Sequence, residues 1–302
     1  MSEVEITEIL GEKGPLTGSE LVERVGLEPL ELWRLCTTRP DILVHRLGRR
    51  FLRLDRAVTG YARLSPSIRR EFLTYTLLDL VGRQDRLELR ATDTRADIHR
   101  ISLAKRRLAS KTMQTVVESL TEGAVVHDKA CFILGGDITY DMAHRVPRPE
   151  RSTGKLVLGS DLDIVVVTAD DFDPSLRETL DDAIYQKKYF LLISPSHREE
   201  IDYLIKDLGT VRRQVAFDTF EHMVACKILA EGEFLYGSRE IFANIQRLLS
   251  EAEIPRKLAG MEAEAVRNRL EAERTLSRVG VGKPGSRFLN LFFTSDEGDE
   301  IY

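Results

Sequence analysis

The chain has 302 residues, 42% of them hydrophobic and 31% charged, which is an ordinary composition for a soluble globular protein of two or more domains. No apolar run approaches the roughly 20 residues of a membrane-spanning helix, and the acidic N-terminus does not resemble a signal peptide, so we expect a cytoplasmic protein with no membrane partner. The net charge of −5 is uneven, because residues 1–120 carry 21 Lys+Arg against 17 Asp+Glu and the remainder carries 23 against 32. A basic excess of this size suits either a polyanionic partner or an ordinary solvated surface.

The first 56 residues alternate short helical patterns with breaks. An apolar spacing over residues 6–10 predicts a first helix, Thr17 with a glutamate three residues later predicts the N-cap of a second, and Pro29 predicts the start of a third. The sequences DILVHRL and FLRLD, separated by a Gly-Arg-Arg turn, then predict a two-stranded hairpin over about 41–55. Three short helices followed by a hairpin resemble a winged-helix domain, here residues 1–56.

The winged-helix resemblance implies a nucleic-acid interface in which the third helix enters the major groove and the hairpin touches the backbone. Six arginines are nominated for it, two near the helix and four on the hairpin: Arg34, Arg39, Arg46, Arg49, Arg50 and Arg53. Winged helices also serve as protein-docking or dimerisation modules. The residues leave both roles open.

The segment 57–91 is expected to be a helical connector, with its main helix over about 65–82. A long amphipathic helix is expected over about 94–120. Its basic residues predict a solvated face, with contact to phosphate as the alternative: Arg100, Lys105, Arg106, Arg107 and Lys111. Near the end of the chain, the apolar stretch FLNLFF at 288–293 is expected to pack against the rest of the protein.

ACFILGGD, residues 130–137, predicts an apolar strand that runs into a Gly135-Gly136 turn. A strand, a glycine turn and a helix start let backbone N–H groups approach a phosphate without obstruction by side chains. The next stretch, HRVPRPERSTGK at 144–155, is basic and contains two prolines, and we expect a long flexible loop with no element of its own. One hypothesis for this loop is that its arginines close over a nucleotide or bind the acceptor: Arg145, Arg148 and Arg151.

GSDLDIVVVT, residues 159–168, places Asp161 and Asp163 at the start of a β-branched run. On a strand both carboxylates point to one face, where they repel each other unless a cation lies between them. Mg²⁺ is the natural cation, because it takes few carboxylates and keeps its other positions for water and substrate phosphates. A third acid comes from the apolar strand EEIDYLIKD, in which Asp202 is preferred and Glu200, on the same face, is the alternative.

The glycine turn, the Ser-Asp-x-Asp before Ile-Val-Val-Val, and the later strand acid together resemble the catalytic pattern of the DNA polymerase β nucleotidyltransferase superfamily, in its bacterial, minimal type. ACKILAEGEFLYGS, residues 225–238, resembles the helix and turn that follow the catalytic strands in bacterial members. The resemblance implies a site for an NTP and two Mg²⁺ ions, or Mn²⁺ in their place. By this resemblance the nucleotide-binding residues are Gly135, Gly136, Ser160 and Lys227, and the catalytic and metal-binding residues are Asp161, Asp163 and Asp202.

Two features depart from the family pattern. Many members have Gly-Ser where this chain has Gly135-Gly136, which removes one hydroxyl contact. The 24 residues between Gly136 and Asp161 are also more than compact members have.

We therefore expect an α+β protein with a winged-helix domain (1–56), a helical connector (57–91), a nucleotidyltransferase core in which helices flank a small mixed sheet (92–215), and a C-terminal helical region with an acidic tail (216–302). The expected activity moves an NMP from an NTP such as ATP to an acceptor hydroxyl and releases pyrophosphate. The acceptor would be a nucleic acid such as RNA, or a protein side chain. The alternative is a winged-helix DNA-binding regulator whose transferase fold senses a nucleotide without catalysis.

Overall fold

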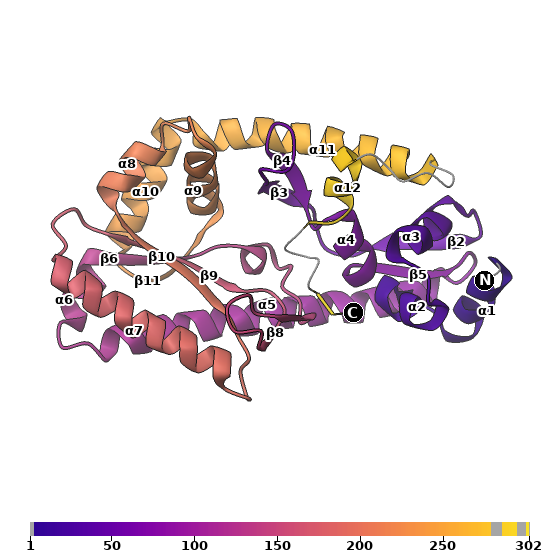
Figure 1. Ribbon diagram of the computed structural model, residues 1–302, viewed down its shortest axis with the longest axis horizontal. Helices are drawn as coiled ribbons and strands as arrows, with labels where there is room; N and C mark the ends of the chain where they lie inside the picture. Colours follow the sequence, from indigo (N-terminus) through magenta and orange to yellow (C-terminus); the bar gives the residue numbers. More distant parts are fainter. Residues whose placement is uncertain (1–2, 279–285, 295–299, 302) are drawn as a thin grey trace. The chain divides into compact units, whose positions relative to one another are not determined.

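The structure, a computed structural model, describes residues 3–278, 286–294 and 300–301. Helices and small sheets are mixed along the chain, so the protein is α+β (Figure 1). Within the part of the chain that is described, no helix combines the length and the apolar character needed to cross a membrane.

The chain forms two compact units, each described by itself below. Unit 1 takes its residues from Met1–Ile98 and Gly260–Glu300, and unit 2 comprises His99–Ala259 and Ile301. Unit 1 is thus discontinuous in sequence. The long helices α5 (Gln84–Glu118) and α11 (Ile254–Arg278) each contribute residues to both units.

Unit 1 combines short helices with two small antiparallel sheets. Besides its parts of α5 and α11, its elements are α1 (Glu3–Lys13), β1 (Leu16–Thr17), α2 (Gly18–Val25), α3 (Pro29–Thr38), β2 (Ile42–Arg46), β3 (Phe51–Leu54), β4 (Ala62–Ser65), α4 (Ile68–Thr74), β5 (Thr76–Leu80) and α12 (Ser286–Phe292). One sheet has the order β1-β5-β2, and β3 and β4 form a separate hairpin.

The three helices predicted in the first 40 residues are confirmed. The capping box of α2 is present, because the Thr17 hydroxyl accepts from the Glu20 N–H at 3.2 Å and the Glu20 carboxylate accepts from the Thr17 N–H at 2.7 Å. The helix ends at Gly26, whose φ of 70° is left-handed. Pro29 is the first residue of α3.

The hairpin expected over 41–55 is wrong, and the helix expected over about 65–82 is confirmed only for α4 (Ile68–Thr74), because strands β4 and β5 lie on either side of it. Strand β2 pairs with β5, and β3 pairs with β4, so both strands find their partners within 57–91. The glycine turn after β2 satisfies a local hairpin pattern, but burial decides the pairing. Leu77 and Leu78 of β5 are fully buried, which makes β5 the central strand of its sheet.

The returning segment of the chain completes the core of unit 1. Leu276 of α11 and Leu291 and Phe292 of α12 are buried with Trp33 of α3 in one cluster. The Trp33 and Phe292 rings meet edge to face, with their centroids 6.3 Å apart. The prediction that FLNLFF packs is confirmed by Leu291 and Phe292.

Unit 2 is built on one mixed sheet. Besides its parts of α5 and α11, its elements are α6 (Gly123–Lys129), β6 (Ala130–Leu134), the 3₁₀ turn η1 (Asp137–Tyr140), β7 (Pro147–Pro149), β8 (Leu156–Leu158), β9 (Leu162–Thr168), α7 (Pro174–Ile193), β10 (Ile201–Asp207), α8 (Leu208–Gln214), α9 (Phe220–Glu231), β11 (Glu233–Gly237) and α10 (Arg239–Glu251). The sheet has the order β10-β9-β6-β11, in which β9 and β10 are parallel and the other pairs are antiparallel.

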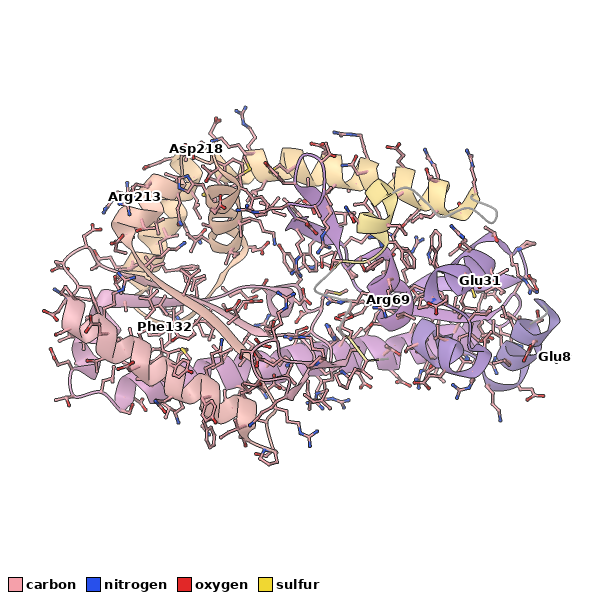
Figure 2. The ribbon with its side chains drawn as sticks, viewed as in Figure 1. Glu8, Glu31, Arg69, Phe132, Arg213 and Asp218 are labelled. Carbon is pink, nitrogen blue, oxygen red and sulfur yellow. The ribbon has the colours of Figure 1, made fainter. Side chains whose placement is uncertain are left out.

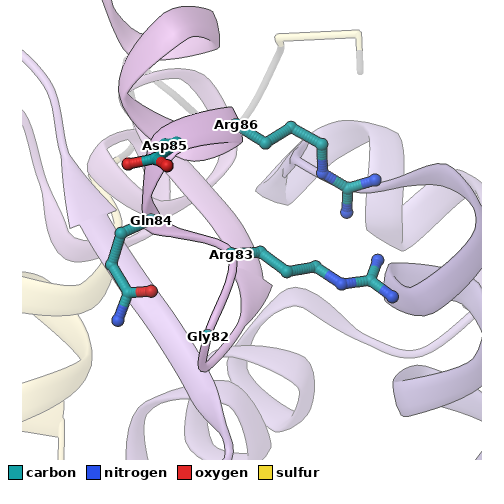
Figure 3. Close-up of a pocket in the computed structure, with 5 residues that line it drawn as sticks. All are labelled: Gly82, Arg83, Gln84, Asp85 and Arg86. Carbon is teal, nitrogen blue, oxygen red and sulfur yellow. The ribbon is translucent and has the colours of Figure 1, made fainter.

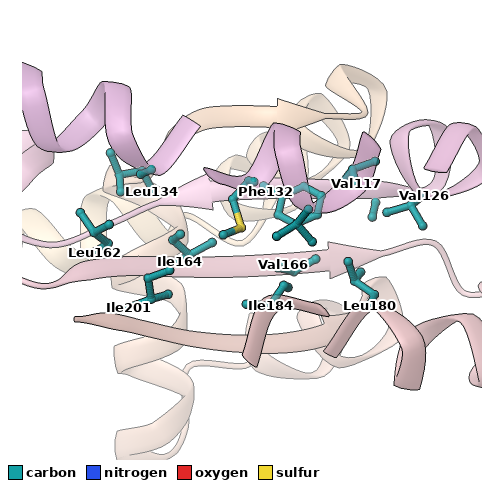
Figure 4. Packing of buried hydrophobic residues seen from close by; sticks show 14 of the residues in the cluster. Val117, Val126, Phe132, Leu134, Leu162, Ile164, Val166, Leu180, Ile184 and Ile201 are labelled. Carbon is teal, nitrogen blue, oxygen red and sulfur yellow. The ribbon is translucent and has the colours of Figure 1, made fainter. Parts of the chain in front are cut away.

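Both faces of this sheet are covered, as the β-branched run of β9 requires. Leu162, Ile164 and Val166 pack with Phe132 and with α5, α6 and α7 in one cluster (Figure 4). Phe132 is also labelled in Figure 2. The alternate residues Val165 and Val167 pack with α8, α9 and α10 in a second cluster. The helices therefore fix the strands from both sides, and only the strand ends are left to carry polar side chains.

Three expectations for unit 2 are corrected by the structure. The stretch 144–155 is not a loop without elements, because β7 pairs with β8 in a two-stranded hairpin. The segment 216–302 is not wholly helical, because β11 pairs with β6. The basic residues of α5 do not all form a solvated face, because Lys105 is 3% exposed.

Candidate active site

The predicted acids gather at one end of the parallel strand pair β9–β10. Asp163, the second residue of β9, is the register partner of Asp202 on β10. Paired residues of adjacent strands project to the same face, here the face that carries Val165 and Val167 farther along β9. Asp161 directly precedes β9, two residues before Asp163. Asp202 is exposed, whereas Asp161 and Asp163 are partly buried.

The glycine turn after β6 lies directly against Asp163. The Gly135 N–H donates to the Asp163 carbonyl at 2.9 Å, which extends the pairing of β6 with β9. Gly136 has a φ of +72°, and a Cβ placed on it would lie 2.0 Å from Oδ2 of Asp163. Only glycine fits at position 136 for both reasons. The sequence Gly-Gly therefore brings the turn and the acid-bearing strand into direct contact.

The carboxylate of Asp161 has a perturbed pKa. Burial and the negative charges of Glu200 and Asp202 together raise this pKa to about 6, against the opposing charge and hydrogen bond of the Arg148 guanidinium. Glu200 and Asp202 therefore both lie close enough to act on Asp161. The register pairs Asp202 with Asp163, and the choice between Asp202 and Glu200 as the third acid stays a prediction.

Arg148, on β7, is the cation nearest to these acids. Its Nη2 donates to Oδ1 of Asp161 and to Oε2 of Glu200, the latter at 2.9 Å. The sequence suggested Arg148 only as a residue that closes over a nucleotide or binds the acceptor. Its contact with the acids depends on the β7–β8 hairpin, for which the sequence has no strong local signal.

Ser160 connects two loops at the acid end of β9. It is 8% exposed, accepts from the His144 N–H at 3.2 Å and donates to Oδ2 of Asp137 at 3.4 Å. Asp137 is the first residue of η1, directly after the glycine turn. Ser160 is therefore close to the proposed phosphate-binding turn, and its hydroxyl already has two partners there.

Lys227 lies on α9 beside the same turn. A Cβ on Gly135 would lie 3.2 Å from Ile228, the next residue of α9, and the Lys227 ammonium lies 5.5 Å from the centroid of the Tyr140 ring. The ammonium also forms an ion pair with Glu231 on α9, and Glu231 accepts from the Tyr140 hydroxyl as well. The structure thus brings Lys227 to the turn, but with a carboxylate partner.

Lys105 is a buried cation that was not singled out for this site from the sequence. From α5 it donates to Oε2 of Glu199 and, at 2.9 Å, to the carbonyl of Leu158. These two residues precede Glu200 and Asp161 closely, so Lys105 ties together the two segments that deliver the acids. The sequence does indicate that Lys105 is buried, because it falls four residues after Ile101 and three before Leu108, on the apolar stripe of its helix.

The arginines nominated in the winged-helix region are largely engaged within unit 1. Arg50 binds Glu71 at 2.6 Å and Glu273 at 2.6 Å, and Arg46 lies 3.5 Å from Glu71. Arg39 binds Asp41, and Arg34 donates to the Leu276 carbonyl at 2.7 Å. Carboxylates that neutralise these side chains leave less positive charge for a nucleic-acid backbone.

A pocket of about 350 Å³ in unit 1 is lined by Gly82, Arg83, Gln84, Asp85 and Arg86 (Figure 3). Arg83 donates to the Gly11 carbonyl at 2.6 Å, and Arg86 binds Asp79 at 2.8 Å. The pocket shares no residue with the acids of unit 2. Its arginines connect the start of α5 to α1 and β5.

The acids suit a hard divalent cation by their chemistry, since carboxylate oxygens are the ligands that Mg²⁺ and Mn²⁺ take. The guanidinium that bridges Asp161 and Glu200 demonstrates that these carboxylates accept a positive charge. Among the residues that the structure describes, however, no three His, Cys, Asp or Glu side chains are arranged as a ready metal site. An ion at Asp161 would lie beside the Arg148 guanidinium, which contacts Oδ1 of this carboxylate.

Comparison of the chain with protein-family models, with curated proteins and with solved structures found no match.

Proposed function

We propose that this protein is a metal-dependent nucleotidyltransferase with a site of the DNA polymerase β type. The observation that carries the proposal is the meeting of three features at one sheet end: Asp161 and Asp163 at the start of β9, Asp202 in register with Asp163 on the parallel neighbour, and Gly136 against Asp163. These are the features that the sequence resemblance requires to come together, and they lie up to 66 residues apart in the chain. If the two aspartates only ended a strand, a glycine turn and a third acid would not be expected beside them.

In the proposed reaction an acceptor hydroxyl attacks the α-phosphorus of an NTP. The new oxygen–phosphorus bond forms as the bond to the β-phosphate oxygen breaks, and pyrophosphate leaves. Asp161, Asp163 and Asp202 would hold Mg²⁺, which when bound offsets the negative charge of the phosphates. Asp202, or Glu200 in its place, receives the proton of the acceptor hydroxyl. The N–H groups of the glycine turn, with Ser160 and Lys227, bind the phosphates of the nucleotide.

The first test is Mg²⁺-dependent release of pyrophosphate by the purified protein, with each NTP and with a cell extract as the source of acceptor. Asp163→Asn should reduce the rate by more than about 100-fold, because the amide keeps the shape of the side chain and loses its charge. Asp182→Asn, which changes an exposed acid on α7, is the matched control and should leave the rate unchanged. Equal activity of Asp163→Asn and the wild type would contradict the proposed site.

The acceptor is identified by the same reaction carried out with α-labelled NTPs. After Mg²⁺ addition, the label should enter one class of molecule: RNA, protein or a small molecule. The class that is labelled by the wild type and not by Asp163→Asn is the acceptor class. In unit 1, carboxylates pair with Arg39, Arg46 and Arg50, which weakens the binding of nucleic-acid phosphates to this unit. A protein acceptor is therefore favoured over a nucleic acid that binds through unit 1.

A further inference from the structure

Arg148 occupies a position at the acids that a divalent cation would also require. Its guanidinium contacts Oδ1 of Asp161 and lies 2.9 Å from Oε2 of Glu200, and its side chain is 15% exposed. Glu200 is 15% exposed as well. This is a largely desolvated contact between one cation and two anions, in which each interaction is stronger than on an open surface.

The hairpin that carries Arg148 is firmly built. At its tip Glu150 is 5% exposed, and its carboxylate accepts from the backbone N–H and the hydroxyl of both Ser152 and Thr153. Burial alone would raise the pKa of Glu150, but these hydrogen bonds outweigh it and lower the pKa to about 2. The tip carboxylate is therefore ionised and fully bonded at neutral pH.

The base of the hairpin is closed as well. Gly159 follows β8 with a φ of +74°, and a Cβ placed on it would lie 1.7 Å from the His144 carbonyl oxygen. The Gly159 N–H donates to the Val146 carbonyl at 3.1 Å, and the Leu158 N–H donates to the Arg198 carbonyl at 2.9 Å. These bonds hold the hairpin beside the segment that leads into β10, and so they keep Arg148 beside the acids.

We propose that Arg148 is an internal counter-ion that occupies the cation position at Asp161 and Glu200, and that it must leave before a divalent cation binds there. Arg148 thereby sets the metal affinity of the site. The inference rests on the proposed function, since it takes Asp161 as a metal ligand. The reason is electrostatic, because a guanidinium and a divalent cation bound to the same carboxylates repel each other at contact distance.

The experiment measures Mn²⁺ binding to the full chain without nucleotide, by the electron paramagnetic resonance signal of free Mn²⁺ at fixed pH and ionic strength. Arg148→Gln removes the competing cation and should tighten binding by roughly 10- to 100-fold, the range expected for loss of charge-assisted hydrogen bonds. Arg145→Gln is the matched control. It removes an exposed positive charge three residues away that is not bonded to Asp161, and it should change the affinity by about twofold or less.

The outcomes separate this inference from the proposed function. If Asp163→Asn abolishes Mn²⁺ binding but Arg148→Gln leaves the affinity at the wild-type value, the metal site stands and the counter-ion role is wrong. Equal tightening by Arg148→Gln and Arg145→Gln would also overturn it, because the effect would then be one of net charge alone. Mn²⁺ binding that Asp163→Asn does not affect would refute the proposed site, and this inference with it.

A measurement on the wild-type protein guards against a variant that fails to fold. The Nη–H signals of Arg148, assigned by their absence in Arg148→Lys, should be protected from solvent exchange in metal-free protein, because Nη2 donates to Asp161 and Glu200. Addition of Mg²⁺ should abolish the protection as the guanidinium leaves Asp161 and Glu200. Protection that persists at saturating Mg²⁺ would overturn the proposal.

Discussion

Gly136 carries two separate constraints at the residue scale. Its φ of +72° lies in the left-handed region, and a Cβ would come within 2.0 Å of Oδ2 of Asp163. The first constraint concerns the backbone alone, and the second concerns the proposed catalytic acid. A comparison with another glycine of similar φ can separate them.

We expect Gly136→Ala to lower the nucleotidyl-transfer rate by more than about tenfold, because the new methyl group displaces the Asp163 carboxylate. Its free energy of unfolding should fall by about 1–3 kcal/mol from backbone strain. The control is Gly154→Ala, since Gly154 has a φ of +68° and no atom lies within 4 Å of the position that its Cβ would take. This variant should lose similar stability in urea unfolding and keep its activity. Equal rates for the two variants would contradict the close approach at Gly136.

At this scale the sequence predicted correctly what has a local reason. Asp163 lies on β9 and Asp161 directly precedes it, whereas the expectation that both carboxylates share one side stays a prediction. The partner of Asp161 could not be predicted in this way. Arg148 reaches it through a hairpin whose strands contain two prolines and only three residue pairs, and that hairpin is stable because of Glu150 at its tip and the tight turn at Gly159.

At the scale of elements, β10 combines the proposed third acid at one end with a buried lysine near the other. Lys206 is 6% exposed and donates to the side-chain carbonyl of Gln214 at 2.8 Å. Burial lowers its pKa to about 8, and the Cys226 thiol opposes this only in part. Lys206 is on the strand face that α8 and α9 cover.

The depressed pKa of Lys206 predicts a defined pH dependence of stability. Between about pH 8 and pH 10.5 the unfolded chain binds a proton that the folded protein does not, so the free energy of unfolding rises with pH over this interval. Lys206→Met should stabilise the protein at pH 7 by about 1–3 kcal/mol, and the gain should shrink as the pH rises through that interval. Urea unfolding at pH 7 and pH 10 measures both values. Lys111→Met, at an exposed position of α5, should show no such change with pH.

Strand pairing was the least predictable property of the elements. The helices α1, α2 and α3 and the strands β6, β9 and β10 follow patterns within their own residues, and the sequence predicts them. The pairing of β2 with β5 and of β11 with β6 joins segments that were expected, from the sequence, to lie in different domains. In both cases the pairing is decided by how much apolar surface it buries. This area depends on segments that are distant in the sequence, so the local pattern of a strand does not indicate it.

At the scale of the whole molecule, unit 1 depends on residues from both ends of the chain. Arg269 of α11 is 2% exposed and binds Glu71 at 3.0 Å, and Glu71 also binds Arg50. The apolar core of unit 1 likewise includes Leu276 and Phe292. The sheet of unit 2 and both clusters on its faces consist of residues before Gly260.

A chain ending at residue 259 should therefore lose the structure of unit 1 and retain that of unit 2. Hydrogen exchange followed by mass spectrometry should show lost protection in α2, α3 and β5, because their core is incomplete and Glu71 loses a buried partner. Protection in β6, β9 and β10 should stay close to that of the full chain, which serves as the control. Unchanged protection in β5 would mean that the returning segment contributes little to unit 1.

The discontinuity of unit 1 also bears on how the protein is made. A ribosome releases the first part of unit 1 and must then synthesise all of His99–Ala259 before the residues that complete its core appear. At about 5–20 residues per second this takes on the order of 10–30 s. Unit 2 can fold during that time, while Trp33 lacks Phe292, the ring that it meets in the finished protein. We therefore expect the nascent N-terminal segment to expose apolar surface during synthesis.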